Sequence, residues 1–107
     1  MFKAMILLKR RDDMSHAAFA DWWLGEHATL ARALPGLRRA IFNLVDGDGS
    51  GPYDGVSELW FDSRAAFDAA YATEHGRAVA ADSIARVSRR ERLFVGEHVL
   101  ADGCAKP

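Results

Sequence analysis

The chain has 107 residues, half of them hydrophobic and 27% charged, and a formal net charge of −1. This length and composition predict a single globular domain that can bury a core of its own. The near-zero net charge gives no general attraction to nucleic acid or acidic membranes, and no apolar stretch has the length of a membrane span. With one cysteine, Cys104, the chain cannot form an internal disulfide, so we expect a cytoplasmic protein.

The hydrophobic pattern predicts elements in the order β-α-β-β-α-β. Alternating apolar residues indicate strands, and apolar residues three or four apart indicate helices. The expected strands cover residues 2–9, 37–45, 53–61 and 90–99. The expected helices are residues 15–34 and a second one that follows Ser63, breaks near His75 and Gly76, and ends near Val87.

This order is typical of the ferredoxin-like α+β fold, in which an antiparallel sheet carries both helices on one face. The other face of the sheet also has apolar residues and therefore needs a cover. A second copy of the chain is the simplest cover, so we expect a homodimer. Residues 1–100 are assigned to this domain and residues 101–107 to a polar C-terminal tail.

The first helix carries the most informative residues. Ser15 can cap its first turn, and Pro35 ends it. Helical spacing places Glu26 and His27 on opposite edges of the apolar stripe, at the border of the buried face. Glu26 could orient His27 or pair with an arginine, although a solvated glutamate is the simpler interpretation.

Several segments resemble the EthD family of the dimeric α+β barrel superfamily. Residues 15–30 read S-x-x-x-F-x-x-W-W-x-x-E-H-A-x-L, and L-P-G-L-R-R follows at residues 34–39. E-L-W-F-D-S-x-x-A-F at residues 58–67 and V-G-E-H at residues 95–98 fit the same family. The resemblance covers about residues 2–99 and implies a small, mostly dimeric protein of degradation or polyketide pathways.

The chain is also similar to methylmuconolactone methylisomerase of the same superfamily, which works without a metal or an organic cofactor. That similarity implies that His27 contributes to the site and that no cofactor is needed. An imidazole titrates near neutral pH and can transfer protons, so His27 is the candidate catalytic residue. The alternative is a histidine that merely packs on Trp23.

Five further residues are candidates for substrate binding. Trp23 and Trp60 could line a pocket for a flat aromatic molecule, although aromatic residues at such spacing are usually core. Asn43 and Tyr53 could donate hydrogen bonds to a substrate oxygen. Glu58 could be an acid or base with a raised pKa if it is buried. Alternatively, it could form an ion pair between strands, with Arg39 as the candidate partner.

Other patterns have simpler interpretations. Residues 46–51 match the start of a calcium loop, but Ser57 stands where a bidentate glutamate is required, so we expect a hairpin loop. The four histidines are too scattered for a metal site. The arginines of residues 86–92 are expected to form a solvated face, and His75 to be a surface residue rather than a haem ligand.

Together these observations predict a small, dimeric, cofactor-independent enzyme of catabolic or polyketide-type metabolism. In an apolar cleft, a neutral His27 would transfer a proton on a compact aromatic, lactone or enol substrate, as an isomerase or as an oxidoreductase of the monooxygenase type. The alternatives are a non-catalytic protein that binds a small ligand in the same cleft, a haem-binding monooxygenase, and a structural dimerisation module.

Overall fold

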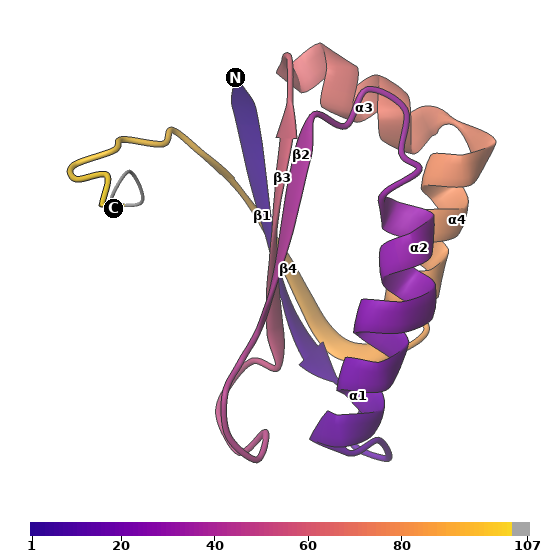
Figure 1. Cartoon of the computed structure of the whole chain (residues 1–107). Coiled ribbons are helices and arrows are strands. Elements are labelled where there is room, and N and C mark those ends of the chain that lie inside the picture. The colour runs from indigo at the N-terminus through magenta and orange to yellow at the C-terminus, as the bar shows by residue number, and fades with distance from the viewer. Residues whose placement is uncertain (104–107) are drawn as a thin grey trace.

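The computed structural model describes residues 1–103 and consists of an antiparallel four-stranded sheet covered on one face by helices (Figure 1). The strand order is β2-β3-β1-β4. This is the predicted ferredoxin-like α+β fold. Cys104 and the remainder of the predicted tail lie outside the described residues. The elements in chain order are β1 (Phe2–Arg10), α1 (His16–Trp22), η1 (Trp23–His27), α2 (Ala28–Ala31), β2 (Arg39–Leu44), β3 (Gly55–Phe61), α3 (Arg64–Ala72), α4 (Glu74–Ile84) and β4 (Val87–Val95).

The last strand is shifted towards the N-terminus relative to the prediction, which was 90–99. Its boundaries follow from its neighbour β1, because each residue of β4 needs a partner for its backbone hydrogen bonds. Arg10 at the end of β1 pairs with Val87, and Lys3 near its beginning pairs with Val95. Beyond Val95 the chain leaves the sheet as an arm that extends away from the body of the domain (Figure 1).

The helical break was predicted near His75 and Gly76 but lies slightly earlier, at Thr73. Thr73 has an extended backbone, and its hydroxyl accepts a hydrogen bond from the amide of Gly76. Thr73 therefore ends α3 and caps α4. The ring Nε2 of His75 is hydrogen-bonded to the carbonyl of Leu30 at 2.7 Å, which ties α4 to α2.

The first helix runs from His16 to Ala31 after the predicted Ser15 cap, but it contains one turn of π-helix, η1. In an α-helix, residues five apart lie about 140° apart around the axis. In η1 the wider turn brings such a pair together, and the rings of Trp22 and His27 have centroids 4.9 Å apart. Single π turns are frequent at functional sites.

The two faces of the sheet have different surroundings. Ser57, Leu59 and Phe61 on β3 face the helices and are buried, whereas Val56, Glu58 and Trp60 alternate with them on the opposite face. The predicted alternation along this strand is therefore confirmed. We call the face without helices the open face. Which face a residue occupies decides whether it can reach the interior of the domain.

Candidate active site

A small cavity lies between the sheet and the helices. The space open to the centre of a water molecule is about 20 Å³, which is room for one ordered water. Every strand contributes to its wall, as do all helical segments except α1. The lining residues are Ile6, Leu8, Trp23, His27, Ala31, Phe42, Ser57, Leu59, Tyr71, Val79, Ala80, Ser83 and Arg90. A mostly apolar wall with a few converging polar groups is typical of a small-molecule site.

His27 is held in this wall by a carboxylate from another helix. Its Nδ1 lies 2.9 Å from Oδ2 of Asp82 on α4, and the same oxygen accepts a hydrogen bond from Nε1 of Trp22 at 3.1 Å. His27 itself is buried. Because Asp82 accepts at Nδ1, the neutral imidazole carries its proton there and keeps a lone pair on Nε2. Nε2 is therefore the nitrogen available to a bound molecule.

The environment of His27 favours the neutral ring. Burial lowers its pKa below the ordinary value, Asp82 opposes that shift, and the positive charge of Arg90 lowers the pKa further. The result is an imidazole that is uncharged at neutral pH and oriented by a carboxylate. These are the properties of a general base.

Tyr71 from α3 and Arg90 from β4 complete the polar part of the cavity. Burial raises the pKa of the Tyr71 phenol, and the nearby Arg90 and Arg92 lower it less, so the phenol is protonated at neutral pH. Burial also lowers the pKa of Arg90. Nε of Arg90 and Nε1 of Trp23 are buried, and within residues 1–103 neither has a hydrogen-bond acceptor.

Trp23 reaches this position because the strand opposite it begins with a glycine. A Cβ on Gly55 would lie 2.6 Å from Cη2 of the Trp23 ring, so any larger residue would displace the indole. Phe42 on β2 stacks on the other side of Trp23, with ring centroids 4.5 Å apart.

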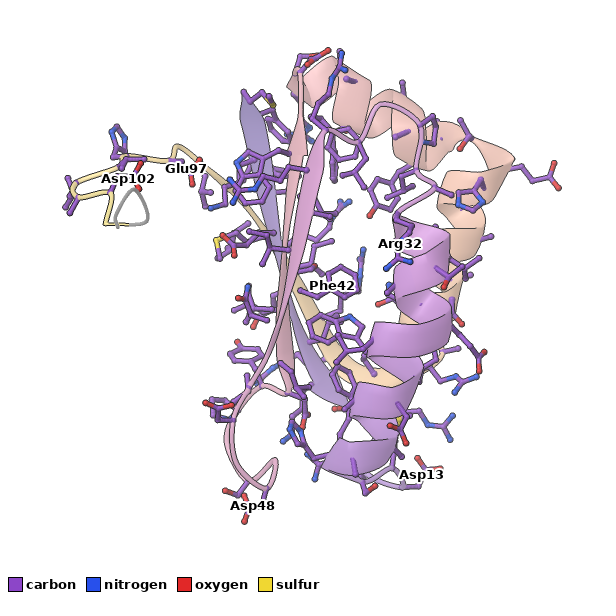
Figure 2. All side chains as sticks on the ribbon, viewed as in Figure 1. Asp13, Arg32, Phe42, Asp48, Glu97 and Asp102 are labelled. Atoms are coloured by element: carbon purple, nitrogen blue, oxygen red, sulfur yellow. The ribbon has the colours of Figure 1, made fainter. Side chains whose placement is uncertain are left out.

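An outer groove of about 240 Å³ adjoins the cavity between the first helix and the edge strand β2. Phe42 and Ala31 belong to the walls of both spaces and separate them. Figure 2 shows Phe42 extending from β2 towards the helices, with Arg32, the residue directly after α2, beside the same space. The remaining lining residues of the groove are Leu24, Ala28 and Ala40.

The family model of the EthD domain matches residues 11–87. The chain belongs to the EthD family. The match includes η1, α3 and α4, which supply His27, Tyr71 and Asp82, and ends before Arg90. The predicted membership is thus confirmed.

Several solved structures share the fold of this chain. An EthD family protein from Bacillus halodurans has a TM-score of 0.77 and 23% identity, with 92% of this chain and 100% of that chain covered. A dimeric ferredoxin-like protein of unknown function from Thermobifida fusca has a TM-score of 0.73 and 19% identity, with 90% of each chain covered. A putative antibiotic biosynthesis monooxygenase from Nitrosomonas europaea has a TM-score of 0.64 and 17% identity, with 91% and 98% covered. No curated protein gives a significant match.

Of the predicted site residues of this EthD domain, the structure brings only His27 and Trp23 to the cavity. Trp60, Asn43 and Glu58 lie on the open face, on the other side of the sheet. Within one chain, these three side chains cannot contact a molecule that is bound beside His27.

The open-face candidates contact one another and other charged residues instead. Nζ of Lys3 lies 2.8 Å from Oε1 of Glu58, and Asn43 donates a hydrogen bond to the same carboxylate. These contacts hold the pKa of Glu58 below its ordinary value, so the raised pKa considered for a buried Glu58 is wrong. An ion pair between strands is present at this residue, but its partner is Lys3 of β1 and not Arg39.

The remaining aromatic candidates are also engaged outside the cavity. Trp60 is buried, with the cations of Lys3 and Arg39 over its ring, and its Nε1 donates to Glu97. The hydroxyl of Tyr53 donates a hydrogen bond to Glu91 of β4. Glu91 lies on the open face, because its partner in β1, Leu7, also pairs with Val56. Neither side chain lines the cavity.

Sequence reasoning missed Asp82, Tyr71 and Arg90. Glu26, the carboxylate considered as a partner for His27, is exposed, and Asp82 takes that role from α4. The expectation of a solvated arginine face was wrong for Arg90, which is half-buried. The available signal was the two-residue period of β4, which places Arg90 on the same face of the strand as the hydrophobic Phe94.

The geometry of the described residues does not favour a metal site or haem binding. Within residues 1–103, no three His, Cys, Asp or Glu side chains come together in a way that could hold a metal ion. His75, the residue considered for haem, is bonded to the backbone of Leu30. In the same part of the chain, every helix is too short or too polar to cross a bilayer.

Proposed function

We propose that this EthD-family protein is an enzyme of small-molecule metabolism that needs no cofactor and uses His27 as its base. The observation that carries the proposal is the His27–Asp82 pair beside the cavity. Asp82 fixes the proton on Nδ1, burial keeps the ring neutral, and Nε2 is left for the substrate.

The reaction class that fits this arrangement is proton transfer next to a carbonyl. Nε2 of His27 removes a proton from a carbon, and the electron pair of that C–H bond moves to the carbonyl oxygen to give an enolate. The imidazolium, whose Nε2 proton exchanges with water, then returns a proton to another carbon, which gives the isomer and the neutral ring. Compact lactones, phenols and enols are substrates of the required chemistry.

Neighbouring structures support a role in small-molecule chemistry and leave the reaction class open. The Nitrosomonas europaea neighbour is described as a putative antibiotic biosynthesis monooxygenase. In an oxidoreductase of that type, molecular oxygen would be the co-reactant of the enolate. The groove beyond Phe42 gives room for the rest of a substrate whose reacting end enters the inner cavity when Phe42 moves.

The second candidate is a protein that binds the same kind of molecule without converting it. It is favoured by the small size of the inner cavity, which has room for one water. Haem binding has less support, because Nε2 of His75 is bonded to a carbonyl of the chain.

Hydrogen exchange on candidate substrates tests the proposal directly. The native protein, incubated in D₂O with small muconolactones, quinols and polyketide mimics, should catalyse deuterium incorporation or product formation detectable by mass spectrometry. His27→Ala should lose this activity by at least about 100-fold, the usual contribution of a general base. His98→Ala is the matched control, because His98 is exposed and remote from the cavity. Ligands that bind both proteins and never exchange would establish the non-catalytic alternative.

We further propose that the protein is a cytoplasmic homodimer that buries the open face of the sheet. Met5, Leu7 and Val56 lie on this face, as does Leu93, whose surface is 50% exposed. An exposed apolar patch of this kind marks an interface. The Thermobifida fusca neighbour is described as dimeric, which supports the same arrangement.

Sedimentation velocity distinguishes the dimer from a monomer. The native protein should sediment as a dimer, and Leu93→Asp should shift it towards the monomer. Ile84→Asp changes an isoleucine that is 62% exposed on α4, so it controls for loss of surface hydrophobicity. A native monomer, or a dimer that Ile84→Asp disrupts and Leu93→Asp does not, would refute the proposed interface.

A further inference from the structure

Two buried hydrogen-bond donors of the cavity wall are unused. Nε of Arg90 and Nε1 of Trp23 have almost no exposed surface and, within residues 1–103, no acceptor. A buried donor without a partner costs free energy, and each such group in a native structure calls for an explanation. Both residues line the same space, which is about the size of one water molecule. An acceptor atom placed in that space would lie beside both side chains.

The charge of Arg90 points to the kind of acceptor. The ionisable groups that act on its pKa are Tyr71 and Arg92, and neither is an anion at neutral pH. Burial lowers the pKa of Arg90, as expected for a guanidinium that has lost water without gaining a carboxylate. A partly buried cation without a counter-ion is electrostatically complementary to an anion.

We infer that Arg90 and Trp23 form an oxyanion site that binds a carboxylate, phenolate or enolate oxygen of the substrate. This inference rests on the proposed function, because the oxygen it binds is the one that becomes negative when His27 removes a proton. The substrate class narrows accordingly to molecules whose acidic C–H lies next to a carbonyl or phenolic oxygen. Donors that are already oriented towards the developing charge stabilise the transition state most.

The positions of His27 and Arg90 in the domain fit their two roles, proton removal by His27 and oxyanion binding by Arg90. His27 comes from η1 and Arg90 from β4, so the base and the cation approach the cavity from the helical layer and from the sheet. Tyr71 also lines the cavity, from α3, and its protonated hydroxyl can donate a hydrogen bond. A substrate that spans the cavity would present its carbon to His27 and its oxygen to Arg90.

Formate is a suitable probe, because it is the smallest carboxylate and needs to place only one oxygen in the inner cavity. The full-length protein labelled with ¹⁵N is titrated with formate at constant ionic strength, with chloride as the reference anion. We expect saturable shifts of the Nε–H signal of Arg90 and the indole signal of Trp23, with little change at Trp60 on the open face. Arg90→Met should weaken formate binding at least about tenfold, as should Trp23→Phe, because each loses a hydrogen bond to a charged group.

Arg92→Met is the matched control. Arg92 lies two residues along the same strand and on the same side of the sheet, but it is exposed and does not line the cavity. Formate binding should be retained in this variant. Absence of saturable binding by the native protein, equal losses in Arg90→Met and Arg92→Met, or full binding by Trp23→Phe would overturn the two-donor site.

Stability separates a binding role from a structural one. If Arg90 serves to bind a ligand, Arg90→Met should unfold at the same temperature as the native protein or at a higher one, because an uncompensated charge is removed. A clear fall in the unfolding temperature would identify Arg90 as a structural cation and overturn the inference.

The titration is repeated on His27→Ala to separate this inference from the proposed function. Formate binding should persist there, because His27 is not a donor in the oxyanion site. Formate binding without any catalysed hydrogen exchange would refute the proton-transfer enzyme while retaining the anion site. Hydrogen exchange that depends on His27, with no formate binding, would refute the anion site alone.

Discussion

The domain contains two histidine–aspartate pairs that look alike in chemistry but differ in their surroundings. His16 places Nδ1 2.6 Å from Oδ1 of Asp54, and His27 places Nδ1 2.9 Å from Oδ2 of Asp82. Asp54 is fully buried and also accepts from the amide of Arg10 at 2.9 Å and from its guanidinium at 2.8 Å. We call His16–Asp54 the closed pair. We call His27–Asp82 the open pair, because it lies beside the cavity; it is not on the open face of the sheet.

The closed pair uses its hydrogen bonds to hold the loop between β2 and β3. Nζ of Lys9 and Nη1 of Arg10 both donate to the carbonyl of Gly49, and Asp54 pairs through its backbone with Leu8. Gly49 has a φ of 82° and lies so close to Arg10 that a Cβ would clash with the guanidinium. The segment is thus the predicted hairpin loop, fixed by cations of the protein itself.

The comparison shows that residue type alone does not mark a functional site. The closed pair is surrounded by cations that satisfy its carboxylate. The open pair lies beside a cavity whose wall contains Nε of Arg90 and Nε1 of Trp23, and within residues 1–103 neither nitrogen has a hydrogen-bond acceptor. Unsatisfied groups that face a cavity are therefore the feature that separates a candidate active site from a structural cluster.

The largest expected effect is on catalysis. Asp82→Asn should lower kcat at least about 100-fold, because an amide no longer fixes the proton on Nδ1 of His27. Asp54→Asn should leave kcat of the folded protein unchanged, since it acts on the closed pair. Turnover rates with any substrate found by the exchange screen measure both. Equal losses in the two variants would mean that the pairs do not differ in function.

Stability should show the opposite order. Asp54→Asn leaves Arg10, Lys9 and His16 around a neutral amide in a buried position and should lower the free energy of unfolding by about 3–5 kcal/mol. Asp82 has a side chain that is 22% exposed, so Asp82→Asn should cost about 1–2 kcal/mol. Urea denaturation gives both values. A larger loss for Asp82→Asn would contradict the division into a structural and a functional pair.

The two pairs should make the free energy of unfolding depend on pH in two different pH ranges. The pKa of His27 is lowered from 6.5 by burial and Arg90 against the opposing effect of Asp82, so the unfolded chain binds the proton more readily. The free energy of unfolding should therefore fall as the pH drops below about 6.5, and stop falling below the pKa of the folded state. This step should be absent in His27→Gln.

Asp54 should respond only in more acidic solution. Burial acts to raise its pKa, but the hydrogen bonds from Arg10 and His16 outweigh that effect and hold the pKa below 3.8. Its contribution to stability is complete above that value and is lost as the pH falls through the lowered pKa. Thermal unfolding of the native protein, His27→Gln and Asp54→Asn across this pH range separates the two steps. A step near pH 6 that survives in His27→Gln would contradict the assignment.

The smallest expected effect comes from Lys9, a cation beside the closed pair. Lys9 donates to the carbonyls of Gly49 and Gly51, and its Nζ lies 3.6 Å from Asp54. Lys9→Met should lower stability by about 1 kcal/mol, because the freed carbonyls can turn to water. Amide exchange of residues 46–51 should become faster while the amides around His27 are unchanged. Faster exchange at both places would show that the pairs are coupled.

The element order was predictable from the sequence because it depends on local patterns. Ser15 caps the first helix as expected, and Ser63 caps α3 through the amide of Ala66. The π turn was not predicted, since it changes only how the turn is hydrogen-bonded and not which residues are apolar. The end of β4 was also missed, because it is set by where β1 begins.

The candidate site was predictable only in part. His27 stands out because a helix with a clear apolar stripe carries it at the edge of that stripe. Glu58 and Trp60 share one face of β3 as expected, and Asn43 lies on the same face of the sheet in β2. Alternation along a strand, however, does not say which face the helices cover. The prediction placed them with His27, and the structure places them on the other side of the sheet.

By itself, the sequence determined the ferredoxin-like fold, the family and two residues of the site, His27 and Trp23, because periodicity, caps and motifs are properties of short segments. Only the tertiary structure decided what His27 faces. Trp22 and Asp82 are separated by 60 residues, and Arg90 enters from the last strand. Contacts over such distances depend on how the helices pack on the sheet, and so do the burial that keeps His27 neutral and the absence of an acceptor for Arg90 within residues 1–103.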